Sequence, residues 1–307
     1  MVDLSVNFAG LKLKNPVFTA SGTCGYADEL SDFMDINQLG GFITKSITLQ
    51  KRDGNDVPRV VETDSGMLNA IGLANIGVDR FTAEKIPIIK QYKTPFFVNI
   101  AGITIEDYVS VAQKLSVCER IAGFELNISC PNVKKGGITF GTDPKLVSEI
   151  TSAIKKNAGN KILMVKLTPN VTDISAIASA AIEAGADALS MINTFTAMVI
   201  DIETRQPVLA NRTGGLSGPA IKPIAVYLTN KVYNEVAKPA NIPILAGGGI
   251  RNASDAIEFL IAGASAISVG TASFIYPDSV VKIIEGLKSY CQRHNIAKIS
   301  ELTGSLK

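Results

Sequence analysis

Short apolar segments recur along the chain, and each ends in a small or polar residue. Eight of them can be delimited, at 16–21, 41–45, 96–100, 124–129, 162–167, 188–193, 243–247 and 266–270. Segments this short and this apolar are typical of strands that are covered on both faces, as in a parallel sheet. The pattern therefore predicts eight buried strands.

Between many of these segments, the apolar residues change to a helical spacing. In 174–182 they follow an i, i+3, i+4, i+7, i+8 stripe, with Thr172 as the expected N-cap and Gly185 as the expected residue after the C-cap. Asp143 precedes a proline, which favours a helix start, and Thr104 opens a pattern that resembles a capping box. Strands and helices are thus predicted to alternate.

This alternation predicts an α/β fold, a single (β/α)8 TIM barrel domain over residues 1–307. An open doubly wound sheet is the alternative, but no Gly-x-Gly-x-x-Gly follows the first predicted strand. Residues 1–15 alternate like a β-hairpin, which we expect to close the bottom of the barrel. Segments 46–80 and 194–219 are expected to be long insertions on the C-terminal face that belong to the active site.

The single histidine, His294, narrows the possible chemistry. A Ser-His-Asp or Cys-His site needs a histidine beside its nucleophile, and the usual three-histidine zinc and two-histidine iron sites need more than one. His294 lies in a polar stretch that is typical of an exposed helix end. The four cysteines show no C-x-x-C spacing, so we expect reduced cytosolic thiols and no metal site: Cys24, Cys118, Cys130 and Cys291.

Charge and hydropathy exclude further classes. The chain has 30 Lys and Arg and 28 Asp and Glu, which gives a formal net charge of +2. This near-neutral charge argues against a nucleic-acid binder. No run of about 18 apolar residues occurs, so no membrane span is expected. The N-terminus has neither a basic nor an apolar signal-peptide region, and we expect a cytoplasmic protein.

Polar residues stand where most of the predicted strands end, and strand ends build the active site of such barrels. They are Ser21, Lys45, Asn99, Asn127, Cys130, Lys166 and Asn193. Lysines inside apolar segments are costly unless they meet an anion, act in chemistry, reach the rim or pair with an acid. Because two lysines occupy equivalent strand ends, we favour a functional role for both.

The glycines after the last two predicted strands suggest a phosphate site. Gly247-Gly-Gly249 and Gly270-Thr271 follow them, where such barrels bind phosphate through backbone N–H groups and a short helix. Two tight turns are the alternative explanation. Asparagines offer one acceptor and two donors each, which suit a planar ring that carries C=O and N–H groups. The candidates are Asn69, Asn127, Asn132 and Asn193.

Cys130 differs from the other three cysteines, which we expect to be inert small hydrophobes. It follows a predicted strand and opens a polar, glycine-containing loop. The nearby Lys134 and Lys135 could favour its thiolate. In a chain without a suitable histidine, a thiolate could serve as the general base.

Several motifs together resemble the class 1 dihydroorotate dehydrogenases. They are Asn127-Ile-Ser-Cys-Pro-Asn-Val133, Ile43-Thr-Lys-Ser46, Asn69-Ala-Ile-Gly-Leu73, Val165-Lys166, Ile192-Asn-Thr194 and Gly214-Gly-Leu-Ser-Gly218. The likeness extends over essentially the whole chain, and 133–143 and 209–211 are similar to the NAD-linked subtype, class 1B. It implies an FMN-containing barrel that oxidises (S)-dihydroorotate to orotate in de novo pyrimidine biosynthesis.

The resemblance also implies roles for individual residues. Cys130 would remove the proton from C5 while hydride passes from C6 to the flavin N5, and Lys166 would stabilise negative charge on the reduced ring. The implied substrate contacts are Lys45, Asn69, Ala70, Ile71, Gly72, Leu73, Asn127, Asn193 and Thr194. The implied FMN contacts are Ser21, Lys45, Ser46, Asn99, Asn127, Lys166, Ile192, Gly218, Gly248, Gly249, Gly270 and Thr271.

The chain shows neither a dinucleotide fingerprint nor a cysteine cluster, so we expect it to bind neither NAD nor an iron–sulfur centre itself. The resemblance implies a second subunit with FAD and a [2Fe-2S] cluster, in a heterotetramer built on a dimer of this chain. The chain departs from the usual subtype residues at Ala197, Val199 and Arg212, which could alter loop packing.

Three alternatives remain open. One is a class 1A-like enzyme that reduces fumarate or another soluble acceptor without a partner. Another is a related FMN barrel that acts on other pyrimidines. The last is a barrel that only binds a phosphorylated ligand.

Overall fold

The computed structural model describes residues 2–129, 134–135 and 138–307. An eight-stranded parallel sheet forms its centre, in the order β3-β18-β17-β12-β11-β8-β7-β4. A parallel bridge between Phe18 and Gly41 joins the first and last of these strands, so the sheet closes into a barrel. The strands are β3 (Val17–Thr19), β4 (Phe42–Ile43), β7 (Phe96–Ile100), β8 (Ile121–Asn127), β11 (Ile162–Lys166), β12 (Ala188–Met191), β17 (Ile244–Gly247) and β18 (Ala266–Val269).

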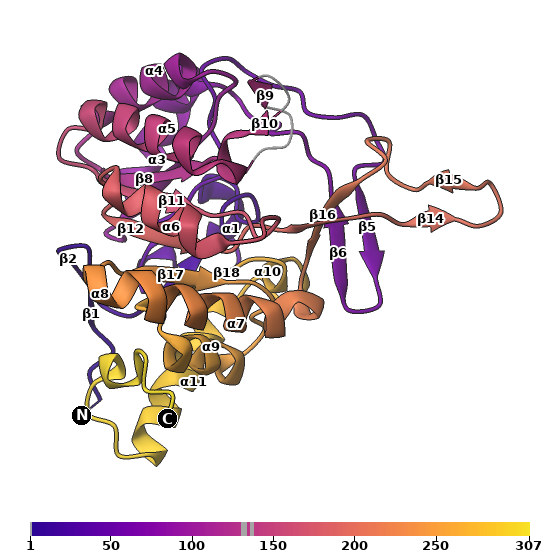
Figure 1. The fold of residues 1–307 in the computed structure, drawn as a ribbon. Coiled ribbons are helices and arrows are strands. Elements are labelled where there is room, and N and C mark those ends of the chain that lie inside the picture. The colour runs from indigo at the N-terminus through magenta and orange to yellow at the C-terminus, as the bar shows by residue number, and fades with distance from the viewer. Residues whose placement is uncertain (1, 130–133, 136–137) are drawn as a thin grey trace.

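Each predicted strand segment coincides with one barrel strand, which confirms the (β/α)8 prediction over the doubly wound alternative. Helices surround the barrel (Figure 1). The longer ones are α4 (Ile105–Ser116), α5 (Pro144–Asn157), α6 (Ile174–Glu183), α7 (Lys222–Val232), α9 (Ala253–Ala262) and α11 (Ser279–Arg293). The short ones are α1 (Asp28–Ser31), α2 (Val78–Arg80), α3 (Ile86–Ile89), α8 (Lys238–Ala240) and α10 (Ala272–Ile275). No helix in the described part of the chain combines the length and apolar character needed to cross a membrane.

The helix ends follow the sequence signals, with one correction. The Thr104 capping box and the Asp143 cap are both present. Thr172 is not the N-cap of α6; Asp173 is, and its carboxylate accepts a hydrogen bond from the backbone N–H two residues on. The aspartate stands next to the first helical residue, so its carboxylate reaches the unpaired N–H groups there. Gly185 follows the helix with φ +100°, as predicted.

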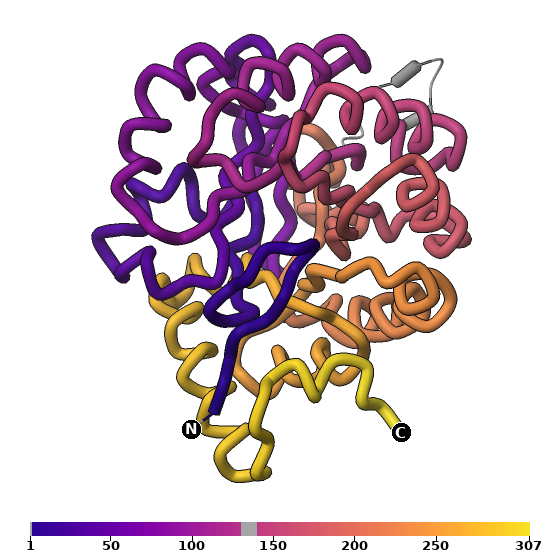
Figure 2. Tube along the Cα trace, turned by 90° about the vertical axis from the view of Figure 1, so that its left-hand side faces the viewer, coloured from indigo at the N-terminus to yellow at the C-terminus, as the bar shows by residue number. Residues whose placement is uncertain are grey.

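The N-terminal hairpin closes the bottom of the barrel. Strands β1 (Val6–Phe8) and β2 (Leu11–Leu13) pair around a turn whose two central residues have positive φ. The fully buried Phe8 ring lies 5.8 Å from the Phe18 ring of β3 and 6.5 Å from the Phe97 ring of β7. Figure 2 shows the hairpin crossing this end of the molecule. The predicted N-terminal hairpin is thereby confirmed, and it closes the barrel through aromatic contacts.

The two long insertions pair with each other, which the sequence did not indicate. Together they form a four-stranded antiparallel sheet in the order β13-β16-β6-β5, beyond the barrel end that lies opposite the hairpin (Figure 1). Its strands are β5 (Val60–Thr63), β6 (Gly66–Asn69), β13 (Phe195–Ala197) and β16 (Gly214–Ser217). Two small hairpins are β9 (Lys134–Lys135) with β10 (Ile138–Thr139), and β14 (Ile200–Asp201) with β15 (Gln206–Pro207).

Candidate active site

A cavity of about 680 Å³ opens at the C-terminal end of the barrel. This volume lies within the range of small-molecule sites, about 300–1,000 Å³. Most of the predicted strand-end residues and the residues of both insertions converge on it. The residues that line the cavity and also belong to the predicted substrate or cofactor contacts are Ser21, Lys45, Ser46, Asn69, Ala70, Ile71, Gly72, Leu73, Asn127, Lys166, Ile192, Asn193, Thr194, Gly218, Gly248, Gly249, Gly270 and Thr271.

Three predicted residues are not part of this group. Asn99 is fully buried and does not line the cavity; its amide nitrogen donates to the carboxylate of Glu125 instead. Cys130, the predicted base, lies outside the described residues, as does Asn132. The assignments of these residues to substrate or cofactor remain predictions.

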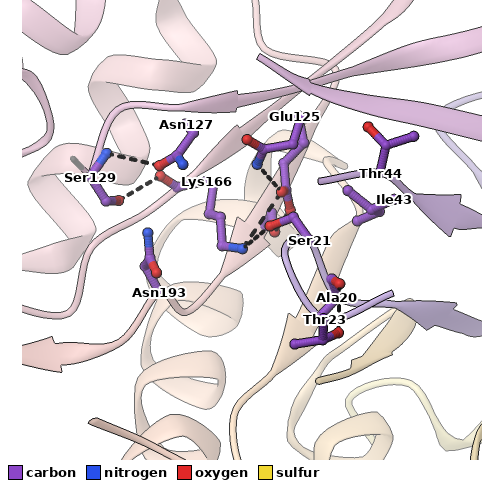
Figure 3. Close-up of polar contacts among 12 residues, drawn as sticks. Ala20, Ser21, Thr23, Ile43, Thr44, Glu125, Asn127, Ser129, Lys166 and Asn193 are labelled. Atoms are coloured by element: carbon purple, nitrogen blue, oxygen red, sulfur yellow. Dashed lines mark hydrogen bonds and ion pairs between the residues drawn. The ribbon is translucent and has the colours of Figure 1, made fainter. Parts of the chain in front are cut away.

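Lys166 lies at the end of β11, and its ammonium contacts two partners (Figure 3). Its ammonium donates to the Ser21 hydroxyl at 2.8 Å and lies 3.5 Å from Oε2 of Glu125. The Glu125 side chain is 1% exposed and the Lys166 side chain 12%. Lys166 therefore does pair with an acid, and it also reaches the cavity wall.

Glu125 is a residue that the sequence reading missed. It stands inside β8, two positions before Asn127, so both side chains lie on the same face of the strand. Its carboxylate accepts hydrogen bonds from Asn99 of β7 and, at 2.7 Å, from the hydroxyl of Ser190 in β12. Two polar residues at a spacing of two within an apolar strand were the available signal.

Lys45, after β4, is the second cation of the cavity. Burial lowers the pKa of Lys45, and the Glu29 carboxylate opposes that effect. Its ammonium has no ion pair with another described residue. A bound anion would offset the lost hydration of this ammonium, since opposite charge favours the charged form.

Amide groups supply hydrogen-bond capacity on the same wall. Oδ1 of Asn127 and Oδ1 of Asn193 each accept from a nearby backbone N–H, at 3.3 and 2.9 Å. Their Nδ2 groups donate to no other described residue and remain available to a ligand. Asn170, which the sequence reading missed, bonds the backbone of Thr194 and Thr196 and so fixes the start of the second insertion.

Glycine is required for conformational reasons after β17. Gly248 and Gly249 have φ +132° and +83°, backbone angles that residues with a side chain rarely adopt. A Cβ at position 249 would lie 2.7 Å from the carbonyl oxygen of Gly218. After the neighbouring strand β18, the Thr271 hydroxyl donates a hydrogen bond to the hydroxyl of Ser217 at 2.9 Å, which joins this turn region to the inserted sheet.

The departures from the subtype lie in the second insertion. Ala197 and Val199 pack against a small apolar cluster that contains Leu68 and Leu209. Arg212 is exposed and has φ +67°, a conformation that glycine adopts more readily. None of the three lines the cavity.

The remaining thiols and the histidine do not line the cavity. Cys24 and Cys291 are buried, and burial raises the pKa of both thiols, as expected for inert cysteines. His294 is exposed at the end of α11, where its ring packs 4.2 Å from the Tyr290 ring. The prediction of an exposed helix end is confirmed.

Comparison with known proteins gives a consistent result over the whole length. The family model for dihydroorotate dehydrogenase matches residues 3–291. The catalytic subunit of dihydroorotate dehydrogenase B (NAD(+)) from Bacteroides thetaiotaomicron is 51% identical over 307 residues, 100% of both chains. The same subunit from Pelobacter propionicus is 50% identical over 305 residues, 99% of both chains. The chain therefore belongs to the dihydroorotate dehydrogenase family.

Proposed function

We propose that the chain is the catalytic subunit of an NAD-linked dihydroorotate dehydrogenase, which oxidises (S)-dihydroorotate to orotate in de novo pyrimidine biosynthesis. The observation that carries this proposal is the convergence of 18 predicted substrate and cofactor residues on one cavity at the C-terminal end of the barrel. Full-length identity of about half to subunits of that name supports it.

The residues around the cavity fit FMN. The turn at Gly248 and Gly249 leaves no room for a side chain, which suits a backbone that approaches a phosphate closely. Gly270 and Thr271 stand beside it on the next strand and lead into α10. When bound, FMN supplies an acceptor for the hydride of the substrate.

The protein's own residues would bind and orient the reactants. Lys45, whose ammonium forms no ion pair with the described residues, would offer its charge to the substrate carboxylate or to the flavin. Asn127 and Asn193 would offer N–H donors to the edge of a pyrimidine ring. Lys166 would hold positive charge where the flavin gains electrons. The assignment of Cys130 as the base at C5 rests on the sequence resemblance.

Electrons would leave through a second subunit. The relatives' names contain both "NAD(+)" and "catalytic subunit", while this chain has no dinucleotide fingerprint. We propose a cytoplasmic heterotetramer built on a dimer of this chain, with FAD and a [2Fe-2S] cluster in the partner.

An absorbance spectrum of the purified chain, taken before and after anaerobic dihydroorotate, tests the proposal. A flavin spectrum that bleaches on addition supports it, and a protein that cannot be reconstituted with FMN refutes it. NAD reduction by the isolated chain would contradict the need for a partner. Rapid fumarate reduction by the isolated chain would favour the class 1A-like alternative.

A further inference from the structure

The interior of the barrel contains a buried carboxylate below the cavity. Glu125 lies opposite Asn99 of β7 in the strand register, and its 1% exposure removes it from solvent. A buried charge is costly unless it is paired and hydrogen-bonded. Apart from Asn127, the other residues of this strand are apolar, so the buried carboxylate requires a strong partner or has a function.

The partners of Glu125 come from three other strands. Asn99 of β7 and Ser190 of β12 donate to its two oxygens, and Lys166 of β11 provides the opposite charge at 3.5 Å. Because β11 separates β8 from β12, the contact with Ser190 crosses the barrel interior. Among the described residues, Lys166 is the one cation paired with this carboxylate.

Two groups hold the Lys166 ammonium. Ser21 accepts its hydrogen bond at the cavity wall, and the buried Glu125 carboxylate attracts it (Figure 3). The carboxylate does not itself line the cavity, so any effect on a bound ligand passes through the protein. Its negative charge offsets part of the positive charge that Lys166 presents there.

We propose that Glu125 is a positioning residue for Lys166, which holds the ammonium at the floor of the cavity and limits how strongly it favours the reduced flavin. This inference rests on the proposed function, in which FMN occupies the cavity beside Lys166. A cation beside the flavin stabilises the electron-rich reduced form, and a carboxylate next to that cation weakens the effect.

The substitution Glu125→Gln removes the charge and keeps the shape. The Gln oxygen can accept from Asn99 and Lys166, and the amide can donate to Ser190, because a hydroxyl accepts as well as donates. Lys166 also keeps its bond to Ser21. We expect the variant to fold, bind FMN and present an ammonium with less opposing charge.

The readout is the midpoint potential of bound FMN, measured by anaerobic dye-coupled titration in the full chain. We expect Glu125→Gln to raise it, with at least a tenfold shift towards reduced flavin at a fixed potential, about 30 mV for a two-electron couple. Glu125→Asp, which retains the charge but retracts it from Lys166, should give a smaller rise. This second variant tests the idea even if the glutamine variant does not fold.

Two controls separate charge at this position from other causes. Asp187→Asn removes a carboxylate that pairs with Lys155 before the first residue of β12, at the opposite end of that strand from the cavity, and should leave the potential unchanged. Ser190→Ala removes one hydrogen bond from Glu125 without changing charge and should shift the potential little; because Ser190 also lines the cavity, FMN affinity is measured in the same variant. An unchanged or lower potential in Glu125→Gln would overturn the inference. Failure of the unaltered chain to bind FMN would instead refute the proposed function.

Discussion

The turn after β17 offers a direct test of where the cofactor phosphate binds. The change is Gly249→Ala. At φ +83° an added Cβ costs about 1–2 kcal/mol. That Cβ would also lie 2.7 Å from the Gly218 carbonyl oxygen and 3.1 Å from the Lys222 backbone nitrogen. Lys222 Cβ, at 2.9 Å, is a third obstacle, and it is bonded directly to the backbone. None of the three atoms can move away without the main chain, so the turn itself must move.

A displaced turn carries its N–H groups away from the phosphate. The strain alone corresponds to about a 5- to 30-fold rise in the FMN dissociation constant, at about 1.4 kcal/mol per tenfold. Quenching of flavin fluorescence by the apoprotein measures this constant. Thermal unfolding of the apoprotein reports any part of the cost that the turn retains as strain.

Gly159→Ala is the matched control outside the cavity. There φ is also positive, +62°, and the added Cβ would meet only Ser116 Cβ, at 4.0 Å. The same kind of backbone strain arises away from the cavity, so we expect FMN affinity within about threefold of the unaltered chain, less than 1 kcal/mol. The reasoning fails if Gly249→Ala changes neither affinity nor melting temperature, or if both variants lose affinity equally.

Three further predictions follow from other parts of the chain. Cys130→Ser should slow flavin reduction by dihydroorotate about 100- to 10,000-fold while FMN stays bound, because a serine hydroxyl is a weaker base than a thiolate. Stopped-flow absorbance measures the rate of flavin reduction, and an unchanged rate would contradict the assignment of Cys130 as the base. Burial lowers the pKa of Lys45, so the unfolded chain binds more protons between the lowered and the ordinary value, and this group makes stability rise with pH there. Lys45→Met should therefore raise the melting temperature of the apoprotein at neutral pH and weaken dihydroorotate binding; a lower melting temperature would argue against the burial cost. Phe8→Ala should cost about 3–5 kcal/mol in urea unfolding, with the flavin potential unchanged, since Phe8 is fully buried at the bottom of the barrel.

The sequence predicted the barrel well because its strands are covered on both faces. Such strands appear as continuous apolar segments, and their ends are marked by the polar residues that face the cavity. That rule selected Lys45, Asn127 and Lys166, all of which line the cavity. It passed over Glu125, because a reading confined to strand ends ignores the residue two positions earlier on the same face.

Other features depend on tertiary pairing that a single sequence does not encode locally. The predicted N-cap of α6 was Thr172 and the observed one is Asp173, a one-residue difference that depends on where the helix begins. Asn170 looks like an ordinary loop asparagine until the fold brings Thr194 beside it. The strand register between the two insertions could not be predicted from the sequence either, because the strands that each insertion contributes are too short to indicate their pairing partner.

The pairing of the insertions has a consequence for how the site forms. Leu68 of β6 lies opposite Leu216 of β16, so this strand pair joins residues almost 150 positions apart in the sequence. Contacts of this separation form only after the intervening strands are in place, because closing a long loop costs entropy before the contact offsets it. Asn69 and Gly218, which the family resemblance assigns to substrate and cofactor, belong to these same two insertions and line the same cavity. The binding wall is therefore completed by the insertions and not by the barrel strands alone, so ligand binding should stabilise the pairing of β6 with β16 as well as the barrel itself.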